Sequence, residues 1–346
     1  MQGNMKVAVM TGIGKMEFTE RPIPQPKPDE VLVKLEYVGV CGSDLHYFEN
    51  GRISDFIVKP PFVLGHEAAG VVVELGSDVK NLKIGDKVAL EPGKTCGCCE
   101  FCRTGQYNLC PDVIFFATPP VDGVFQEYVA HEAGLCFKLP DKISTMEGAL
   151  IEPLAVGFHA GIMGNAKLGQ TALVTGSGCI GLVSMLALKA LGVSRVFVSD
   201  VVKKRLEKAK DLGADLVING AEQDVLKTIA GQASGLDLVV ETSGVEAAAK
   251  EGIGALKKGG TFVFVGYSKN GMMNLPMGLA TDKELSFKTI FRYRHVYPLA
   301  IDAVNRGLVN IKNIVSNVFE FNDIQKAMEE SINKKAEIVK SVVKIC

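Results

Sequence analysis

The sequence predicts an α/β protein in which an antiparallel β domain is joined to a parallel sheet covered by helices. Short β-branched runs separated by turns fill the first third of the chain, whereas apolar runs alternate with amphipathic helical patterns from about residue 165 onward. A glycine-rich turn at 176–181 also follows an apolar run directly. Near-continuous apolar strands that alternate with helices are typical of a parallel sheet buried on both faces.

The composition excludes several classes of protein. The chain has 346 residues, a length typical of about two domains. Its 38 basic and 39 acidic side chains leave a formal charge of −1, which argues against nucleic acid or an anionic membrane as partner. Hydrophobic residues at 47% and charged residues at 22% are values of globular chains. Because no secretory signal or membrane span is evident, we expect a soluble, cytoplasmic protein.

In the first third, four β-branched runs predict the strands of the antiparallel domain. Turn signals separate them, including a proline-rich loop at 21–28 and the glycine turn at 84–86. The predicted strands are Val7–Met10, Val31–Val40, Ala68–Leu75 and Lys87–Leu90.

From about residue 165, the order of elements predicts a doubly wound parallel sheet. Helices are expected from the glycine turn to Leu191, over Lys203–Leu212 and near Val245–Leu256. The predicted strands are Thr171–Thr175, Arg195–Asp200, Ala214–Asn219, Leu236–Glu241, Gly260–Gly266 and, as a sixth, Glu284–Phe291. The remaining chain is expected to return to the first domain. We therefore expect one domain of residues 1–153 and 292–346 and a second of residues 154–291.

The glycine turn predicts a dinucleotide site. Gly176, Gly178 and Gly181 match the G-x-G-x-x-G pattern between a strand and a helix, and Asp200 ends the next strand. Such glycines allow a tight turn, close approach of a pyrophosphate to the backbone and close packing of helix on strand. The helix N-terminus then offers free amide groups to the diphosphate. Further cofactor contacts are expected from Ile180, Arg205, Val265, Ile290 and Arg292.

Asp200 favours NAD over NADP. A carboxylate accepts hydrogen bonds from both ribose hydroxyls of NAD, whereas it repels a 2′-phosphate by ~4 kcal/mol per charge pair at about 4 Å and an effective dielectric of 20. Three basic residues follow closely and could pair with a 2′-phosphate, namely Lys203, Lys204 and Arg205. Lysines at these positions are, however, also typical of the solvated face of a helix.

Clustered cysteines predict a structural metal site in a lobe of about residues 92–112. Cys96, Cys99, Cys102 and Cys110 give the spacing C-x2-C-x2-C-x7-C, which can close a zinc tetrahedron without an open position. Cys98 leaves open which of residues 98 and 99 is the ligand. An iron–sulfur cluster is an alternative, whereas the near-neutral charge disfavours a nucleic-acid zinc ribbon.

A second group of metal-ligating residue types is spread along the chain. It consists of Cys41, of His66 and Glu67 in a Gly-His-Glu segment, and of Glu152 before a proline. Each of these residues alone is weak evidence for a metal site, because a buried cysteine is usually inert packing and a single histidine is more often a structural core residue. Together they offer thiolate, imidazole and carboxylate, a set suited to a catalytic zinc ion with one open position.

Five motifs lie around these residues: Cys41-Gly-Ser-Asp-Leu-His-Tyr47, Gly65-His-Glu67, Phe115-Phe-Ala-Thr-Pro-Pro120, Leu150-Ile-Glu-Pro-Leu-Ala155 and Phe291-Arg-Tyr293. They resemble the motifs of the zinc-containing medium-chain dehydrogenases, and within that family those of the polyol dehydrogenases. The resemblance spans nearly the whole chain. It implies a GroES-like catalytic domain and a Rossmann domain. Alcohol dehydrogenases of the family usually have Cys where this chain has Glu152, and some animal polyol dehydrogenases lack the cysteine lobe.

The resemblance implies roles for single residues. Cys41, His66 and Glu67 would bind the catalytic zinc, and Glu152 would either ligate it or hold the bound water and substrate. Ser43 and His46 match the family's proton relay. The residues that would line the polyol pocket are Tyr47, Phe115, Glu152, Arg292 and Tyr293.

The sequence therefore predicts an NAD-dependent polyol dehydrogenase with one catalytic and one structural zinc ion per chain. It would oxidise a secondary hydroxyl of a polyol such as sorbitol or xylitol to a ketose, without nucleic acid or membrane partners and as a homotetramer. Another zinc enzyme of the family, such as a threonine or butanediol dehydrogenase, is the alternative activity. A non-enzymatic alternative is a structural NAD-binding relative that accumulates as a storage protein. The presence of Cys41, His66 and Glu152 argues against this alternative.

Overall fold

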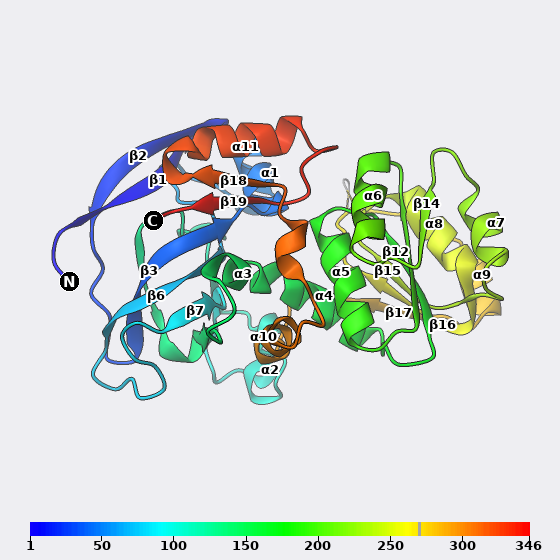
Figure 1. Cartoon of the computed structure of the whole chain (residues 1–346), viewed down its shortest axis with the longest axis horizontal. Helices are drawn as coiled ribbons and strands as arrows, with labels where there is room; N and C mark the ends of the chain where they lie inside the picture. Colours follow the sequence, from blue (N-terminus) through cyan, green and yellow to red (C-terminus); the bar gives the residue numbers. More distant parts are fainter. Residues whose placement is uncertain (269–270) are drawn as a thin grey trace. The chain divides into compact units, whose positions relative to one another are not determined.

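The computed structural model describes residues 1–268 and 271–346, and the chain divides into two units. Unit 1 comprises Met1–Glu152, Tyr297–Asn305 and Val315–Cys346, and unit 2 comprises Pro153–Val296 and Arg306–Ile314. The first strands (blue) and the last helix and strand (red) belong to the same unit, so the chain leaves unit 1 and returns to it (Figure 1). The predicted fold class, with an antiparallel and a parallel sheet, is confirmed.

A seven-stranded sheet forms most of unit 1, in the order β11-β7-β6-β3-β19-β18 with β10 also paired to β3. Its pairs are antiparallel except for β18 with β19. Three antiparallel pairs, β1–β2, β4–β5 and β8–β9, complete the described strands of this unit. The strands are β1 (Asn4–Gly12), β2 (Lys15–Pro22), β3 (Glu30–Gly39), β4 (Arg52–Ile53), β5 (Phe56–Ile57), β6 (Glu67–Leu75), β7 (Lys87–Leu90), β8 (Gly93–Lys94), β9 (Ile114–Phe115), β10 (Tyr128–Glu132), β11 (Cys136–Lys138), β18 (Asn317–Glu320) and β19 (Ser341–Lys344).

The helices of unit 1 are short and lie in the connections. Those described are α1 (Gly42–Asn50), α2 (Glu100–Arg103), α3 (Thr145–Ala149), α10 (Tyr297–Asn305) and α11 (Ile324–Asn333), with the 3₁₀ turns η1 (Tyr107–Leu109), η2 (Ala133–Leu135) and η4 (Phe321–Asp323). Helix α4 (Ile151–Met163) starts in unit 1 and continues into unit 2.

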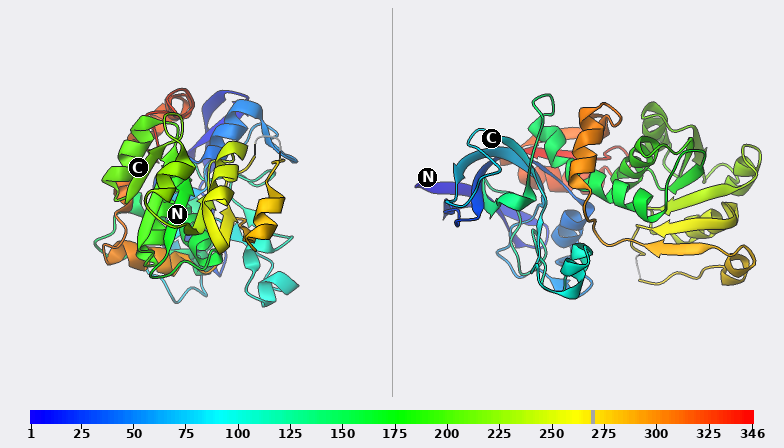
Figure 2. Two further views of the ribbon diagram at one scale, coloured as in Figure 1. Left: turned by 90° about the vertical axis from the view of Figure 1, so that its right-hand side faces the viewer. Right: turned by 90° about the horizontal axis from the view of Figure 1, so that it is seen from below.

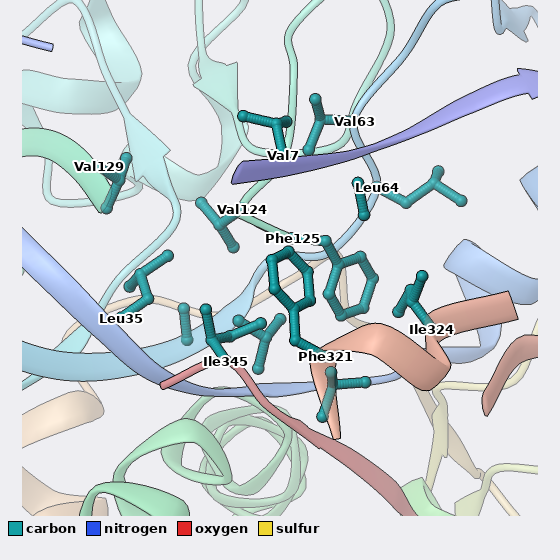
Figure 3. Packing of buried hydrophobic residues seen from close by; sticks show 14 of the residues in the cluster. Val7, Leu35, Val63, Leu64, Val124, Phe125, Val129, Phe321, Ile324 and Ile345 are labelled. Carbon is teal, nitrogen blue, oxygen red and sulfur yellow. The ribbon is translucent and has the colours of Figure 1, made fainter. Parts of the chain in front are cut away.

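The core of unit 1 joins residues from both ends of the chain. Val31, Val33 and Leu35 alternate along β3 and are fully buried in it. Figure 3 shows Phe125 in the middle of this core, among side chains of the N-terminal strands and of the C-terminal segment, including Ile345. Burying such a side chain contributes about 1.5–3 kcal/mol, so the C-terminal segment is a structural part of the unit.

Unit 2 holds a six-stranded parallel sheet in the order β14-β13-β12-β15-β16-β17. Strand β17 lies at one edge of it (Figure 2). The strand order reverses between β12 and β15, and because crossovers are right-handed, the helices before and after this point cover opposite faces. The strands are β12 (Thr171–Thr175), β13 (Arg195–Asp200), β14 (Leu216–Asn219), β15 (Leu236–Glu241), β16 (Leu256–Phe264) and β17 (Ser286–Thr289).

The helices of unit 2 connect these strands. They are α5 (Cys179–Ala190), α6 (Lys203–Asp211), α7 (Val225–Ala230), α8 (Glu246–Ala255) and α9 (Met277–Asp282), with the 3₁₀ turn η3 (Ile311–Ile314). Among the described residues, no helix is both long and apolar enough to cross a membrane.

Candidate active site and metal centres

A buried carboxylate ties together the two loops that carry Cys41 and His66. Cys41 is the N-cap of α1, and Asp44 lies in the first turn of that helix. The Asp44 carboxylate accepts the backbone N–H groups of Cys41 and of Gly65, each at 2.9 Å. Asp44 is fully buried, and this burial raises the pKa of its carboxyl above the usual value. Two segments distant in sequence are thus held side by side.

Cys41, His66 and Glu67 form a compact group of potential metal ligands. One ligand atom of each lies within 4.8 Å of the others, and His66 and Glu67 are buried. Burial by itself lowers the pKa of His66, but the Cys41 thiolate and the carboxylates of Asp44 and Glu152 outweigh it and raise this pKa well above its ordinary value. A thiolate, an imidazole and a carboxylate are a donor set that fits zinc.

Lys340 is the ion-pair partner of Glu67, a member of this group. The two side chains form an ion pair and are 2% and 1% exposed, and the Lys340 ammonium also donates to the carbonyl of Val40 at 3.0 Å. Gly39 leaves the space for the carboxylate, because a Cβ at that position would lie 2.0 Å from Glu67 Oε2. A buried charge needs a partner of opposite sign, and Lys340 supplies it from the other end of the sequence.

The remaining predicted residues of the reaction site are divided between the units. In unit 1, Glu152 is buried in the first turn of α4, and α1 carries half-buried Ser43, exposed His46 and buried Tyr47. The ring of Phe115 lies 5.8 Å from the ring of His66, measured between centroids.

Arg292 and Tyr293, by contrast, belong to unit 2. Arg292 has a positive φ of 54°, and its guanidinium lies 4.8 Å from the ring centre of Phe291. Tyr293 is buried.

Two sulfur–sulfur distances in the cysteine lobe are close to those of a zinc tetrahedron. The Sγ atom of Cys96 is 3.9 Å from that of Cys102 and 3.5 Å from that of Cys110. A tetrahedron with Zn–S bonds of about 2.3 Å has sulfur atoms about 3.8 Å apart. Cys99 completes the group within 4.8 Å, whereas Cys98 is exposed.

Backbone groups prepare this lobe for a cation. The N–H groups of Cys98 and Cys99 and the thiol of Cys110 lower the pKa of Cys96 to about 6. Cys96 is therefore largely a thiolate at neutral pH, which is the form that binds metal. The structure thus brings together the four cysteines named from their spacing.

A cavity of about 370 Å³ in unit 2 lies at the reversal point of the parallel sheet. Gly176, Gly178, Asp200 and Arg205 line it, as do exposed parts of the segment 242–245. Gly176 has a φ of +89°, and a Cβ at Gly181 would lie 1.9 Å from the Gly176 carbonyl oxygen, so both positions require glycine. Ligands of open parallel sheets bind in this kind of crevice, at the carboxyl ends of the strands.

Asp200 is held in place by the turn it faces. Its Oδ2 accepts the backbone N–H and the hydroxyl of Ser177 at 2.6 and 2.9 Å, and its Oδ1 accepts the N–H groups of Val201 and Val202 at 2.7 and 2.9 Å. The carboxylate therefore keeps its orientation and places a negative charge at the wall of the cavity.

Other predicted cofactor contacts do not line this cavity. Ile180 lies in the first turn of α5. Val265 and Ile290 follow β16 and β17, where their N–H groups donate to the carbonyls of Glu241 and Phe264.

Sequence reasoning missed the segment after β15. Glu241 is fully buried, and its carboxylate accepts the N–H groups of Ser243 and Gly244 at 2.7 and 2.9 Å. This shapes the turn that brings Thr242, Ser243 and Val245 to the cavity. The position of the segment, at the carboxyl end of the strand beside β12, was the available signal.

Family models match both parts of the chain. The alcohol dehydrogenase GroES-like domain matches residues 27–141, and the zinc-binding dehydrogenase domain matches residues 179–306.

Known proteins are similar over nearly the whole length. Sorbitol dehydrogenase of Bacillus subtilis is 42% identical over 343 residues, covering 98% of this chain and 97% of its own. Sorbitol dehydrogenase of Bos taurus is 45% identical over 327 residues, covering 93% and 92%. Among solved structures, an Escherichia coli oxidoreductase of unknown specificity, ECK1772, superposes with a TM-score of 0.95 at 41% identity, covering 99% and 100%.

The fold, the ligand groups and these similarities define a dehydrogenase of the alcohol dehydrogenase class. The chain belongs to the zinc-binding medium-chain dehydrogenase family. The resemblance noted from its motifs is thereby confirmed.

Proposed function

We propose that this enzyme is an NAD-dependent polyol dehydrogenase that oxidises a secondary hydroxyl of a sorbitol- or xylitol-like polyol to a ketose. The observation that carries the proposal is the group of half-buried Cys41 with buried His66 and Glu67, where the Glu152 carboxylate is close enough to raise the pKa of His66. The relatives named as sorbitol dehydrogenases support the same substrate class.

Cys41, His66 and Glu67 would hold the catalytic zinc. A bound zinc ion supplies Lewis acidity, which lowers the pKa of a coordinated water from 15.7 to about 7 and acts on an alcohol in the same sense. Asp44 keeps the Cys41 and Gly65 backbones in register for this binding. Glu152 either completes the ligand set or holds the substrate hydroxyl.

The hydroxyl proton leaves through α1. Ser43 and His46 lie on this helix, directly after Cys41, and His46 is exposed to solvent. We infer that Ser43 accepts the proton and passes it to the His46 imidazole, which exchanges it with water. A positioned relay of this kind contributes typically 10²–10⁴-fold to the rate.

The cavity of unit 2 would hold the adenosine part of NAD. Bound NAD would supply the hydride acceptor, and the fixed Asp200 carboxylate would accept hydrogen bonds from its ribose hydroxyls. The same negative charge disfavours a 2′-phosphate, so NAD is the expected cofactor rather than NADP. Arg205 lines the same cavity as the available cation.

A substrate panel tests the proposal. Formation of NADH is measured with sorbitol, xylitol, galactitol, threonine and butanediol, before and after treatment with a chelator. We expect turnover of at least one polyol, loss of activity on chelation and recovery with zinc. Activity with threonine or butanediol alone would identify the enzyme as a threonine or butanediol dehydrogenase. Inactivity with all five substrates would contradict the proposal.

Two variants separate the chemistry from the fold. Cys41→Ala removes a thiolate ligand and is expected to lower kcat at least 10³-fold, with an unchanged circular dichroism spectrum. Cys136→Ala, which removes a buried thiol from β11, serves as the control and should keep its kcat. Retained activity in Cys41→Ala would remove zinc from the mechanism.

A further inference from the structure

The cysteine lobe is the loop of a β-hairpin whose base lies beside the candidate metal site. Strand β8 leads into the lobe and β9 follows it, and the two pair antiparallel with Gly93 opposite Phe115. A Cβ at Gly93 would lie 3.1 Å from Phe115 Cδ2, so the ring lies against the backbone of β8. The same ring lies 5.8 Å from that of His66. Phe115 thus connects the hairpin to a candidate metal ligand.

Tyr107 links the cysteine lobe by a hydrogen bond to Glu91, which lies shortly before β8. It lies in η1, between Cys102 and Cys110, and its hydroxyl donates to Glu91 Oε1 at 2.8 Å. Glu91 stands directly before the Pro92-Gly93 step that opens β8 and is 4% exposed. The lobe is therefore connected to the start of β8 by a side-chain hydrogen bond as well as by the backbone.

The backbone of Glu91 gives this link a rigid anchor. Its N–H donates to the carbonyl of Leu135 at 2.9 Å, and its own carbonyl accepts from His131 Nε2 at 2.8 Å. Burial raises the pKa of the Glu91 carboxyl to about 7, an effect that the hydroxyl of Tyr107 reduces and the charge of Glu152 increases. A buried carboxyl requires a hydrogen-bond partner, and Tyr107 provides one.

We propose that Tyr107 and Glu91 are positioning residues for the substrate, because their hydrogen bond fixes the β8–β9 hairpin and thereby holds Phe115 in place beside the metal site. The pair acts through Phe115 and takes no part in proton or hydride transfer. This inference rests on the proposed function, because the family resemblance implies that Phe115 lines the pocket of a polyol substrate. Loss of the bond should therefore weaken substrate binding and leave the chemical step intact.

The first test is steady-state kinetics on the zinc-loaded Tyr107→Phe enzyme. We expect the KM for the best polyol to rise about fivefold, which is the scale of one hydrogen bond. The value of kcat should stay within about twofold, and the KM for NAD and the zinc content should not change.

Tyr297→Phe is the matched control. Its hydroxyl donates to the carbonyl of Leu90 at 2.8 Å, next to Glu91 on the chain, and Tyr297 comes from α10 rather than from the lobe. We expect its polyol KM to match that of the wild type. If both Tyr→Phe variants raise KM equally, general loosening of the strand end explains the effect and the proposal is overturned.

A second series tests the pair from its acceptor side. Glu91→Gln keeps an oxygen that accepts from Tyr107 and should retain the wild-type KM, whereas Glu91→Ala should behave like Tyr107→Phe. The double variant Tyr107→Phe/Glu91→Ala should be no worse than either single variant, because both remove the same bond. Should Tyr107→Phe lose zinc or fail to fold, an equal KM in Glu91→Gln and Glu91→Ala would overturn the proposal.

A readout that needs no activity uses the absence of tryptophan from the sequence. In a Phe115→Trp background, adding Tyr107→Phe should shift the emission to the red and increase quenching by acrylamide, and adding Tyr297→Phe should not. Unchanged emission after Tyr107→Phe would overturn the proposal. A wild type without activity on any polyol would contradict the proposed function alone, and the tryptophan emission would still decide on the positioning pair.

Discussion

Asp200 is the side chain that we expect to select between NAD and NADP. Its carboxylate is fixed by four donors from the protein and faces the cavity of unit 2. Asp200→Asn removes the charge and keeps an acceptor oxygen, so we expect the preference for NAD over NADP, as a ratio of kcat/KM values, to fall at least about tenfold.

Asp237→Asn is the control for this change. Asp237 accepts the N–H of Thr171 at 2.8 Å, at the start of β12 rather than at its carboxyl end. The preference of Asp237→Asn for NAD over NADP should equal that of the wild type. An unchanged ratio in Asp200→Asn would show that Asp200 does not select the cofactor.

Gly39 is a second single position with a measurable consequence. A Cβ there would collide with Glu67 Oε2, which is held in a buried ion pair with Lys340. We expect Gly39→Ala to destabilise the chain by about 2–4 kcal/mol and to lower the zinc content, measured by calorimetry and metal analysis. Gly42→Ala, where no neighbour lies within 4 Å, should change neither quantity. A wild-type zinc content in Gly39→Ala would contradict this account of Glu67.

His159 makes stability depend on pH. Burial and the positive charge of Arg294 lower the pKa of this histidine to about 4. The unfolded chain takes up a proton near pH 6.5 whereas the folded chain does not, so stability is lost as the pH falls from 6.5 toward 4, by about 2 kcal/mol at pH 5. Urea unfolding of His159→Gln should show a smaller loss between pH 7 and pH 5 than the wild type, and His295→Gln, at an exposed site, should show the same loss as the wild type. Equal losses in all three proteins would refute the assignment.

Among the structural elements, the cysteine lobe makes the clearest prediction. Cys99→Ser should release one zinc ion per chain and lower the thermal midpoint by at least about 4 °C, because a small lobe depends on its metal. Cys98→Ser should keep both zinc ions and the midpoint, since Cys98 is exposed outside the group of four thiols. The reverse outcome would exchange the roles of the two cysteines.

The elements also show what could be predicted from sequence. Strands β12, β13 and β15 were predicted with the bounds that the structure has, because fully buried strands read as continuous apolar runs. Strand β2 was missed, since most of its residues are exposed and only Met16 is buried. Helix α7 was missed because its six residues are too few to establish a helical period.

Site residues could be predicted from the sequence where the pattern that marks them lies within one short segment. The cysteine spacing and the glycine turn lie within short segments, so their ligand types could be named directly. The pairs Glu67–Lys340 and Glu91–Tyr107 join residues from separate segments and follow no periodic pattern. Only the folded chain brings such partners together.

At the level of the whole molecule, we predict a homotetramer. The expectation comes from the family resemblance, and static light scattering of the zinc-loaded enzyme should give four times the mass of one chain. A single-chain mass at micromolar concentration would contradict it.

The place of β19 has a consequence for the order of events during synthesis. This strand pairs with β3 beside Gly39, and Lys340 just before it neutralises Glu67. A nascent chain that has not yet released residues 340–344 from the ribosome therefore holds the Glu67 carboxylate, one of the potential metal ligands, without its buried cation. Unit 2 contains its sheet within one continuous stretch and can fold before that moment. We therefore expect unit 1 to complete the buried ion pair of Glu67 only after the C-terminal segment has been synthesised and has paired with β3.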